Sequence, residues 1–458
     1  MLVHQPQFSR KRLSSLCLSA FGLVFSCHVH ALDLMQAYEL ALVRDPVFQS
    51  ATLDYQAGLE DASIGRASLL PKLVANYNKA TNRTTISGTQ NFAGAPIGGY
   101  SYNSNYPSDY AALQLTQPLF SLDALARSRQ GSAQADFSRS KFAYLTLDLS
   151  MRVLQAYTDL LYAMDHLRFQ EAESLAFEEQ AKVSARMNQK GEAPITDTLQ
   201  AQATAQVSRA KVIEAVDELE NAKRKLESIL GEPITDLRKV AKLQDKFSFL
   251  LVEPTTFAEW KERALANNAE LAAMKNQVEV AKQEYAKNHG AHYPVVNLVA
   301  AATAQTSNTT ATINQVANQS YAGFQVNLPL YAGGEINARS NQAYLNYQKT
   351  QSDYEVAKER VITELRKQYD LTRSGRLKIQ ALTEAKESSL KLVDAMRKSV
   401  RSGERINLDV LTADRTLFNS QQDLSQAKYV YLIAYIKLYQ LGGNFDLTTL
   451  QKVASYFK

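Results

Sequence analysis

Cysteine is almost absent from this chain of 458 residues: Cys17 and Cys27 are the only two, and both lie within the first thirty residues. If that segment is removed, no disulfide framework, thiolate nucleophile or cysteine-based metal site remains. The sequence also lacks the glycine-rich phosphate loop, the HExxH motif and a Ser/His/Asp arrangement of the kind found in enzymes. We therefore expect no catalytic residue, no cofactor and no metal.

The N-terminal segment has the pattern of a secretory signal peptide. A basic start (Arg10, Lys11, Arg12) precedes an apolar run at residues 13–25, and Val29 and Ala31 fit the small positions of a cleavage site. The run is shorter than the roughly 20 residues of a spanning helix. We predict a signal peptide at 1–31, which leaves a formal charge of +2 instead of +5 and no footprint for nucleic acid. Lipid attachment at Cys27 is the alternative, which the bulky Phe25 disfavours.

Beyond residue 31, no apolar run is long enough for a transmembrane helix. A closed β-barrel is the other structure that satisfies every backbone hydrogen bond in lipid. Together with the signal peptide, this points to the bacterial outer membrane.

Proline and glycine are scarce in two long stretches. No proline occurs between Pro118 and Pro194 or after Pro329, and Gly131 and Gly375 stand isolated. Both stretches are rich in good helix formers, and helices of about 70 residues would reach roughly 100 Å. The helices we predict lie at 121–190, 195–230, 335–401 and 405–441.

The two halves of the chain repeat. Matching residues recur at an offset of 211 or 212: Gly191 with Gly403, Asp197 with Asp409, and Pro118 with Pro329. We predict an internally duplicated protomer, with repeats at 32–245 and 246–458.

Small or apolar residues alternate at spacings of three and four in both shorter helices. This spacing is typical of a coiled-coil seam with close backbone approach. The second helix has Val410, Ala413, Leu417, Ser420, Leu424, Ala427, Tyr431, Ala434, Leu438 and Leu441; the first has Thr198, Ala201, Ala205, Ser208, Val212, Ala215, Leu219, Ala222, Leu226 and Ile229.

Segments before each of the two prolines alternate between apolar and polar residues, which is typical of barrel strands. We predict β-hairpins at about 72–118 and 295–329, with an outward-facing loop at 87–107 and a shorter one at 306–320. A soluble hairpin packed on a helix is the alternative. Four strands cannot enclose a lumen, and open edges are not tolerated in lipid. Several protomers must then share one barrel, with Pro118 and Pro329 at the junctions between barrel and helices.

The whole sequence resembles the TolC family of outer-membrane efflux and secretion channels. The resemblance rests on LDLMQAYELALVRDP, SLLPKL, the Pro-Leu-aromatic junctions and LDVLTADRTLFNSQQDLSQAKYVYL, in this order. It implies an α+β membrane protein: a homotrimer with a 12-stranded β-barrel in outer-membrane lipid, continuous with an α-helical coiled-coil tunnel in the periplasm. It also implies docking to a periplasmic membrane-fusion (adaptor) protein and an inner-membrane ABC or proton-driven transporter. The type I secretion branch is the most similar.

The resemblance also implies a periplasmic aperture at the helix-to-helix turns. Thr196 and Asp197 occupy its first-turn positions, Arg405 its basic position and Asp409 an acidic ring position, and all of these residues could equally be simple helix-end charges. Thr412 and Val400 depart from the family pattern, where an acid and an aromatic residue are expected. Gly191 and Gly403, at the helix tips, are candidates for adaptor contact or for left-handed helix caps.

The function that follows is a passive outer-membrane exit duct for type I protein secretion, multidrug efflux or both. A periplasmic coiled-coil scaffold or adaptor without a pore is the alternative.

Overall fold

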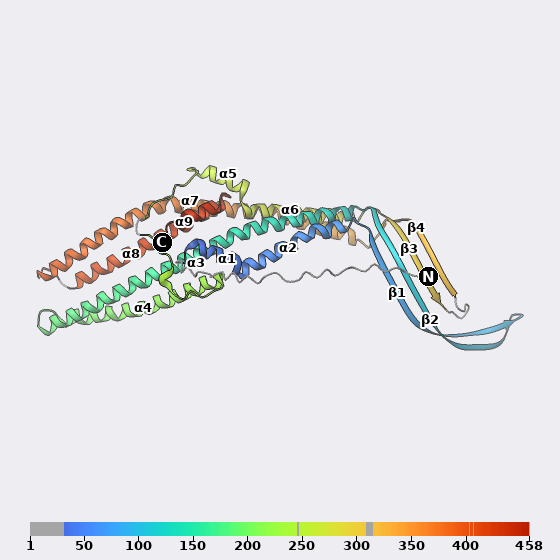
Figure 1. Cartoon of the computed structure of the whole chain (residues 1–458), viewed down its shortest axis with the longest axis horizontal. Helices are drawn as coiled ribbons and strands as arrows, with labels where there is room; N and C mark the ends of the chain where they lie inside the picture. Colours follow the sequence, from blue (N-terminus) through green and yellow to red (C-terminus); the bar gives the residue numbers. More distant parts are fainter. Residues whose placement is uncertain (1–31, 245–246, 308–314, 403, 406, 458) are drawn as a thin grey trace, which may run out of the picture.

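The computed structural model describes residues 32–457 apart from 245–246, 308–314, 403 and 406. The predicted signal peptide and Gly403 therefore lie outside the described residues. The molecule is elongated, with a β-sheet at one end and the tips of two helical hairpins at the other (Figure 1). Its elements are α1 (Leu34–Arg44), α2 (Pro46–Ala67), β1 (Lys72–Phe92), β2 (Ala95–Phe120), α3 (Leu122–Gln189), α4 (Ile195–Leu230), η1 (Leu237–Lys239), α5 (Phe257–Asn267), α6 (Ala269–Gly290), β3 (Val295–Ser307), β4 (Gln315–Asn327), α7 (Glu335–Arg401), α8 (Asn407–Leu441) and α9 (Leu447–Ala454).

Helices α1 and α3 begin where the sequence supplies a side chain to cap them, whereas α4 and α7 begin after Pro194 and Gly334 without a side-chain cap. Asp33 accepts a hydrogen bond from the backbone N of Gln36 at 2.7 Å and forms a capping box at the start of α1. Ser121 accepts one from the backbone N of Ala124 at 3.1 Å at the start of α3. No proline follows inside α3, so the helix continues uninterrupted to Gln189.

The four strands form one antiparallel sheet in the order β1-β2-β3-β4. Leu73, Leu115 and Ala300 lie in register across the first three strands, on a face where apolar residues recur. The opposite face carries Gln114 and Asn76, which are polar. Val74 and Ala301 lie beside Gln114 on that opposite face, which is therefore mixed, and the first face is the more apolar of the two. Among the described residues, β1 and β4 each pair on one side only.

The loop predicted at 87–107 is wrong, because these residues extend β1 and β2 as a continuous hairpin. The turn is at Ala93 and Gly94, where both residues have positive φ. Short polar side chains pair across the strands; Thr85 Oγ1, for example, donates to Asn103 Oδ1 at 2.6 Å. Glycine, serine and asparagine indicated a loop by their propensities, but the backbone ladder and these cross-strand pairs outweigh local propensity.

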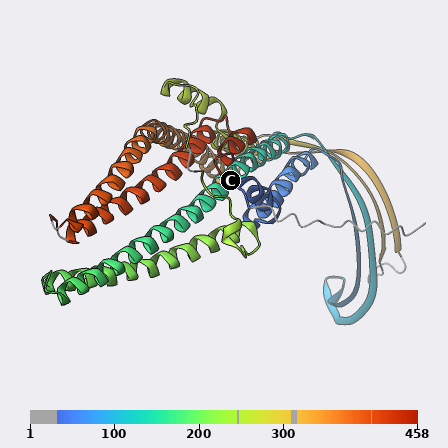
Figure 2. The same ribbon diagram turned by 60° about the vertical axis from the view of Figure 1, so that its left-hand side comes forward.

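Helix α3 is the element against which most others pack. Its half near the sheet contacts α2 and α6, and its remote half contacts α4 and α8. Helix α7 packs on α6 and then on α8. The two hairpins, α3/α4 and α7/α8, run in the same direction and end in separate tips (Figure 2). The order of two strands, a long helix and a shorter helix thus occurs twice along the chain.

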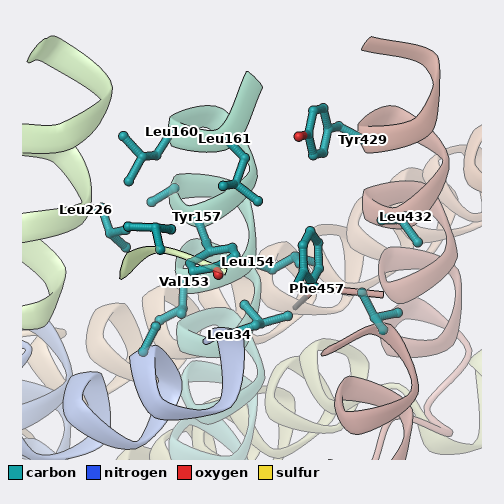
Figure 3. Packing of buried hydrophobic residues seen from close by; sticks show 14 of the residues in the cluster. Leu34, Val153, Leu154, Tyr157, Leu160, Leu161, Leu226, Tyr429, Leu432 and Phe457 are labelled. Atoms are coloured by element: carbon teal, nitrogen blue, oxygen red, sulfur yellow. The ribbon is translucent and has the colours of Figure 1, made fainter. Parts of the chain in front are cut away.

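The main hydrophobic core lies midway along the helices, where α1, α3, α4, α8 and α9 meet (Figure 3). Tyr157 is fully buried there, and its hydroxyl donates to the carbonyl oxygens of Leu32 at 3.0 Å and Ala241 at 2.8 Å. Its ring packs edge-on against Phe457. Burial raises the pKa of Tyr157, so its hydroxyl remains a neutral donor.

Glycine lets α2 and α3 approach closely below the sheet. A Cβ atom on Gly131 would overlap the carbonyl oxygen of Asp61, and one on Gly65 would lie 2.8 Å from the carbonyl oxygen of Arg127. The two backbones touch at this crossing, so neither position has room for a side chain.

Among the described helices, none has the length and hydropathy needed to cross a membrane.

Candidate aperture at the helical tips

The two tips turn by the same hydrogen-bond pattern. In the first, the backbone N of Glu192 donates to the carbonyl oxygen of Met187 at 2.9 Å; in the second, that of Glu404 donates to Ser399 at 3.0 Å. Such a bond closes a helix C-terminus when the residue just before the donor is left-handed. Gly191 has φ +78° and fits this requirement. It therefore acts as the cap predicted for it.

Thr196 and Asp197 lie in the first turn of α4, directly after the tip. Thr196 is exposed and Asp197 is half-buried. Within the described part of the protomer, no ion pair joins Asp197 to a cation. Its carboxylate is at the positive end of the α4 dipole, where an acid is stabilised.

Arg405 and Asp409 lie together at the start of the other helix. Arg405 Nη1 is 3.7 Å from Asp409 Oδ2, with the two side chains 59% and 34% exposed. An exposed pair of this kind contributes little to stability, about 0.2–1 kcal/mol. The structure thus brings Arg405, which precedes α8, to Asp409 in the first turn of α8 and, in the described protomer, not to Asp197.

A stronger ion pair, which the sequence reasoning missed, joins α7 to α8 farther from the tip. Arg397 Nη2 lies 3.0 Å from Oδ1 and 3.3 Å from Oδ2 of Asp414. Asp414 is 6% exposed. Burial raises the pKa of Asp414, while Arg397 acts in the opposite direction. The sequence contains an indication of this ion pair, because Asp414 directly follows Ala413 of the apolar seam and therefore lies beside the packed face of the helix.

The first hairpin has no such pair at the equivalent positions, Ala185 and Gln202. Near its tip Thr198 Oγ1 donates to the carbonyl oxygen of Ser184 at 3.2 Å, and farther along an ion pair joins Arg209 Nε to Glu178 Oε1 at 2.9 Å. The two hairpins therefore differ in chemistry although their turns are alike.

The predicted seam is buried in both hairpins. All of its residues on α4 except Val212 are buried, as are all on α8 except Ser420 and Leu441. Leu411 of α8 also packs against Phe177 of α3. The seam thus holds each hairpin together, and Leu411 links one hairpin to the other.

The two proline junctions are not alike. Pro118 lies inside β2, opposite Asn297, and the strand continues to Phe120 before α3 begins at Leu122. Pro329 lies between β4 and α7, in a connection that ends with Gly333 and Gly334, both with positive φ. The prediction that the first hairpin ends at Pro118 is thus wrong by two residues, because β2 ends at Phe120. Proline is tolerated there because it lies near the end of the strand.

Comparison with known proteins identifies the family. The family model for outer membrane efflux proteins matches residues 37–232 and 260–444. The alkaline protease secretion protein AprF of Pseudomonas aeruginosa is 34% identical over 98% of this chain and 92% of its own length. The proteases secretion protein PrtF of Dickeya chrysanthemi is 32% identical over 93% and 92%, and the outer membrane protein TolC of Escherichia coli is 26% identical over 94% and 87%.

Solved structures show the same fold. The Campylobacter jejuni CmeC outer membrane channel matches with a TM-score of 0.74 at 18% identity, covering 93% of this chain and 90% of that one. The outer membrane protein VceC of Vibrio cholerae matches with a TM-score of 0.72 at 17% identity, covering 90% and 96%. The predicted α+β class, mostly helical, is confirmed by these neighbours. The chain belongs to the family of outer membrane efflux proteins.

Proposed function

We propose that this protein is a passive outer-membrane exit duct of a tripartite export system, serving type I protein secretion. The observation that carries this function is the similarity, over nearly the whole chain, to two proteins named for protease secretion. The family consists of channels and not of enzymes. The helical part lies in the periplasm, and the sheet lies in the outer membrane.

The working form is a homotrimer of internally duplicated protomers. Strands β1 and β4 each have an edge unpaired within the described protomer, and such an edge is unfavourable in lipid. Three copies of the four-stranded sheet would close a barrel of twelve strands, with Leu73 and Leu115 on its lipid-facing side. The long helices of three copies would close the tunnel beneath it.

The tips form the periplasmic aperture. Thr196 and Asp197 on one hairpin and Arg405 and Asp409 on the other are the residues we assign to it. In a ring of three copies, Asp197 would face the basic tip of the neighbouring hairpin and draw Arg405 away from Asp409. Weak links of this kind suit a gate, because it must open.

The remaining assignments concern partners and junctions. Gly191 and Gly403 would contact a periplasmic membrane-fusion protein that connects the duct to an inner-membrane ABC or proton-driven transporter. Glycine leaves the turn without a side chain, so a partner helix can approach the backbone. Pro118 and Pro329 mark the passage from barrel to tunnel.

A periplasmic scaffold without a pore is the weaker candidate, because the sheet has an extended apolar face that a soluble protein would cover. Fractionation of cells separates the two. We expect the protein in the outer membrane, extracted only by detergent, as a trimer that dissociates on heating. Recovery in the soluble periplasmic extract would refute the duct. Deletion of the gene should also abolish secretion of the cognate substrate, and complementation should restore it.

A further inference from the structure

Residues 81–107 form a two-stranded ribbon, the outer ribbon, at the end of the sheet remote from the helices. Within the described chain they pair only with each other, whereas β2 pairs with β3 from Ser108 onward. At about 3.4 Å per residue, the ribbon extends about 40 Å along its strands. It bends away from the direction of the sheet (Figure 1). An isolated two-stranded hairpin is marginally stable at best in water, so the outer ribbon needs a further packing surface.

The more apolar face of the sheet changes character where the outer ribbon begins. In the sheet this face carries Leu73, Ala75 and Tyr77. The next pair on the same face is Lys79 and Asp109, whose Nζ and Oδ1 lie 3.6 Å apart. Beyond this ion pair the face has only polar residues on β1: Thr81, Arg83, Thr85, Ser87 and Thr89. A lipid-facing band ends where such residues begin, so in the proposed trimer the outer ribbon lies in water outside the membrane.

The other face of the outer ribbon has three tyrosines and no charge. Tyr100, Tyr102 and Tyr106 lie on the side that continues the face of Asn76 and Gln114 in the sheet. Tyr100 and Tyr102 are 44% and 45% exposed, and their ring centroids lie 6.4 Å apart. We define the tyrosine face as these three residues with their neutral neighbours Asn82, Thr84, Ile86, Gly88 and Ser104.

The single charged residue of the outer ribbon, Arg83, lies on the opposite face. The tyrosine face is therefore a neutral aromatic surface that the described protomer leaves partly open.

Contacts across the two strands hold the tyrosine face in place. Thr84 Oγ1 donates to the hydroxyl of Tyr106 at 3.4 Å, and Asn82 Nδ2 donates to Ser108 Oγ at 2.8 Å. Thr84 and Asn82 are half-buried, whereas Arg83 between them is exposed. A preformed surface of this kind loses less conformational entropy when a partner packs on it.

The position of the tyrosine face suggests its partner. Asn76 and Gln114 lie on the side of the sheet that faces the lumen in the proposed barrel, so the tyrosine face is turned toward the threefold axis. Twelve strands about 4.8 Å apart and tilted by about 40° give a barrel radius of roughly 12 Å. The outer ribbon is therefore long enough to reach the axis, where three identical faces meet.

Identical faces can meet at a symmetry axis only if they do not repel each other. The tyrosine face fulfils this condition because it has no charged residue. The opposite face does not, since it would bring three copies of Arg83 together. Tyrosine also suits such a contact, because its ring buries a large apolar area while its hydroxyl finds a hydrogen-bond partner.

We propose that the tyrosine faces of three copies pack against one another outside the membrane, so that the partner of this surface is the same surface of a second and a third copy. The proposal rests on the homotrimer of the proposed function and adds a contact between copies beyond the barrel. The packed ribbons narrow the outer exit of the duct and separate when cargo leaves.

Cysteine cross-linking of the full-length protein tests this contact. Both native cysteines lie in the predicted signal peptide at 1–31, so each variant introduces the single cysteine of the mature chain. Tyr100→Cys, Tyr102→Cys and Tyr106→Cys probe the tyrosine face. Ser101→Cys, Asn103→Cys and Asn105→Cys, on the same strand but on the opposite face, are the matched controls. Each variant is oxidised mildly in outer membranes and as purified trimer in detergent, and the products are separated by denaturing electrophoresis without reductant.

We expect a covalent dimer of the chain from at least one variant of the tyrosine face, several times more abundant than from any control. Its yield should not fall when the purified trimer is diluted, because the contact lies within one trimer. Intact trimers without this dimer, or equal yields from both faces, would overturn the ribbon contact and leave the duct standing. Products with another outer-membrane component in place of the dimer would assign the face to a different partner and also overturn it. Absence of the trimer itself would overturn the ribbon contact and the proposed assembly together.

Discussion

Arg397 on α7 lies 3.0 Å from the buried carboxylate of Asp414 on α8 and links the two helices above their tip. The side chain of Arg397 is 54% exposed, whereas the side chain of Asp414 is 8% exposed. Removing Arg397 should therefore destabilise the protein more than removing Asp414, because only Asp414 would be left charged and away from water.

We predict that Arg397→Gln destabilises the protein by about 1–3 kcal/mol and that Asp414→Asn costs less than about 1 kcal/mol. The first leaves a buried carboxylate without its cation, whereas the second leaves an arginine that reaches solvent. Urea denaturation of detergent-solubilised protein measures both. Asp394→Asn, which removes an exposed partner of Lys398, is the control and should have little effect. A larger loss from Asp414→Asn than from Arg397→Gln would contradict this account.

The same pair predicts a pH dependence. The folded pKa of Asp414 is raised by burial, so the folded state binds a proton more tightly there than the unfolded state. This contribution to stability is fully present below the ordinary pKa of aspartate, near 3.9, and is lost as pH rises through the raised value. Hydrogen exchange at α7 and α8 should show this component in wild type and not in Asp414→Asn. Identical pH profiles for the two proteins would refute it.

The aperture assignment predicts a change in conductance. Arg405→Ser with Asp197→Ala should raise the leak conductance of the duct in planar bilayers, because the charges that hold neighbouring tips are removed. Lys398→Ser with Asp394→Ala, an exposed pair on α7, is the matched control. Unchanged conductance at equal trimer content would remove Arg405 and Asp197 from the gate.

The sequence predicted those parts of the fold in which burial repeats periodically along a helix. The seam from Val410 to Leu441 could be recognised because a helix that buries one stripe must repeat small or apolar residues at spacings of three and four. The extension of β1 and β2 could not be recognised, since its stability comes from pairing with the facing strand. Tyr100, for example, covers the space beside Gly88 on that strand. Composition alone therefore indicated a loop.

The candidate site was predictable only in part, for a related reason. Gly191 was identifiable because a helix end requires a residue that adopts positive φ. The link between Arg397 and Asp414 depends on how α7 and α8 are rotated against each other, which a single helix pattern does not specify. Asp414 was therefore overlooked, although Ala413 beside it was correctly assigned to the seam.

The close crossing of α2 and α3 predicts a glycine requirement. Gly131→Ala should destabilise the protein by about 1–3 kcal/mol, because the added Cβ meets the carbonyl oxygen of Asp61 and the helices must separate. Thermal unfolding and the yield of heat-sensitive trimers measure the effect. Gly323→Ala, where a Cβ would meet no atom of the described protomer within 4 Å, is the control. Equal behaviour of the two variants would show that the crossing can relax at no cost.

Removing the hydroxyl of Tyr157 should lower the stability of the protein, because this group ties together the two ends of the described chain. Tyr157→Phe keeps the ring but leaves the carbonyl oxygens of Leu32 and Ala241 without this donor. We expect a cost of about 1–3 kcal/mol, because the group is buried and water cannot replace the hydroxyl. Tyr347→Phe, which removes an exposed hydroxyl on α7 that accepts from Gln351, should cost less than about 0.5 kcal/mol. Denaturant unfolding compares the two, and limited proteolysis near residue 32 should increase only in Tyr157→Phe. Unchanged proteolysis together with unchanged unfolding would mean that α1 is held by its apolar contacts alone.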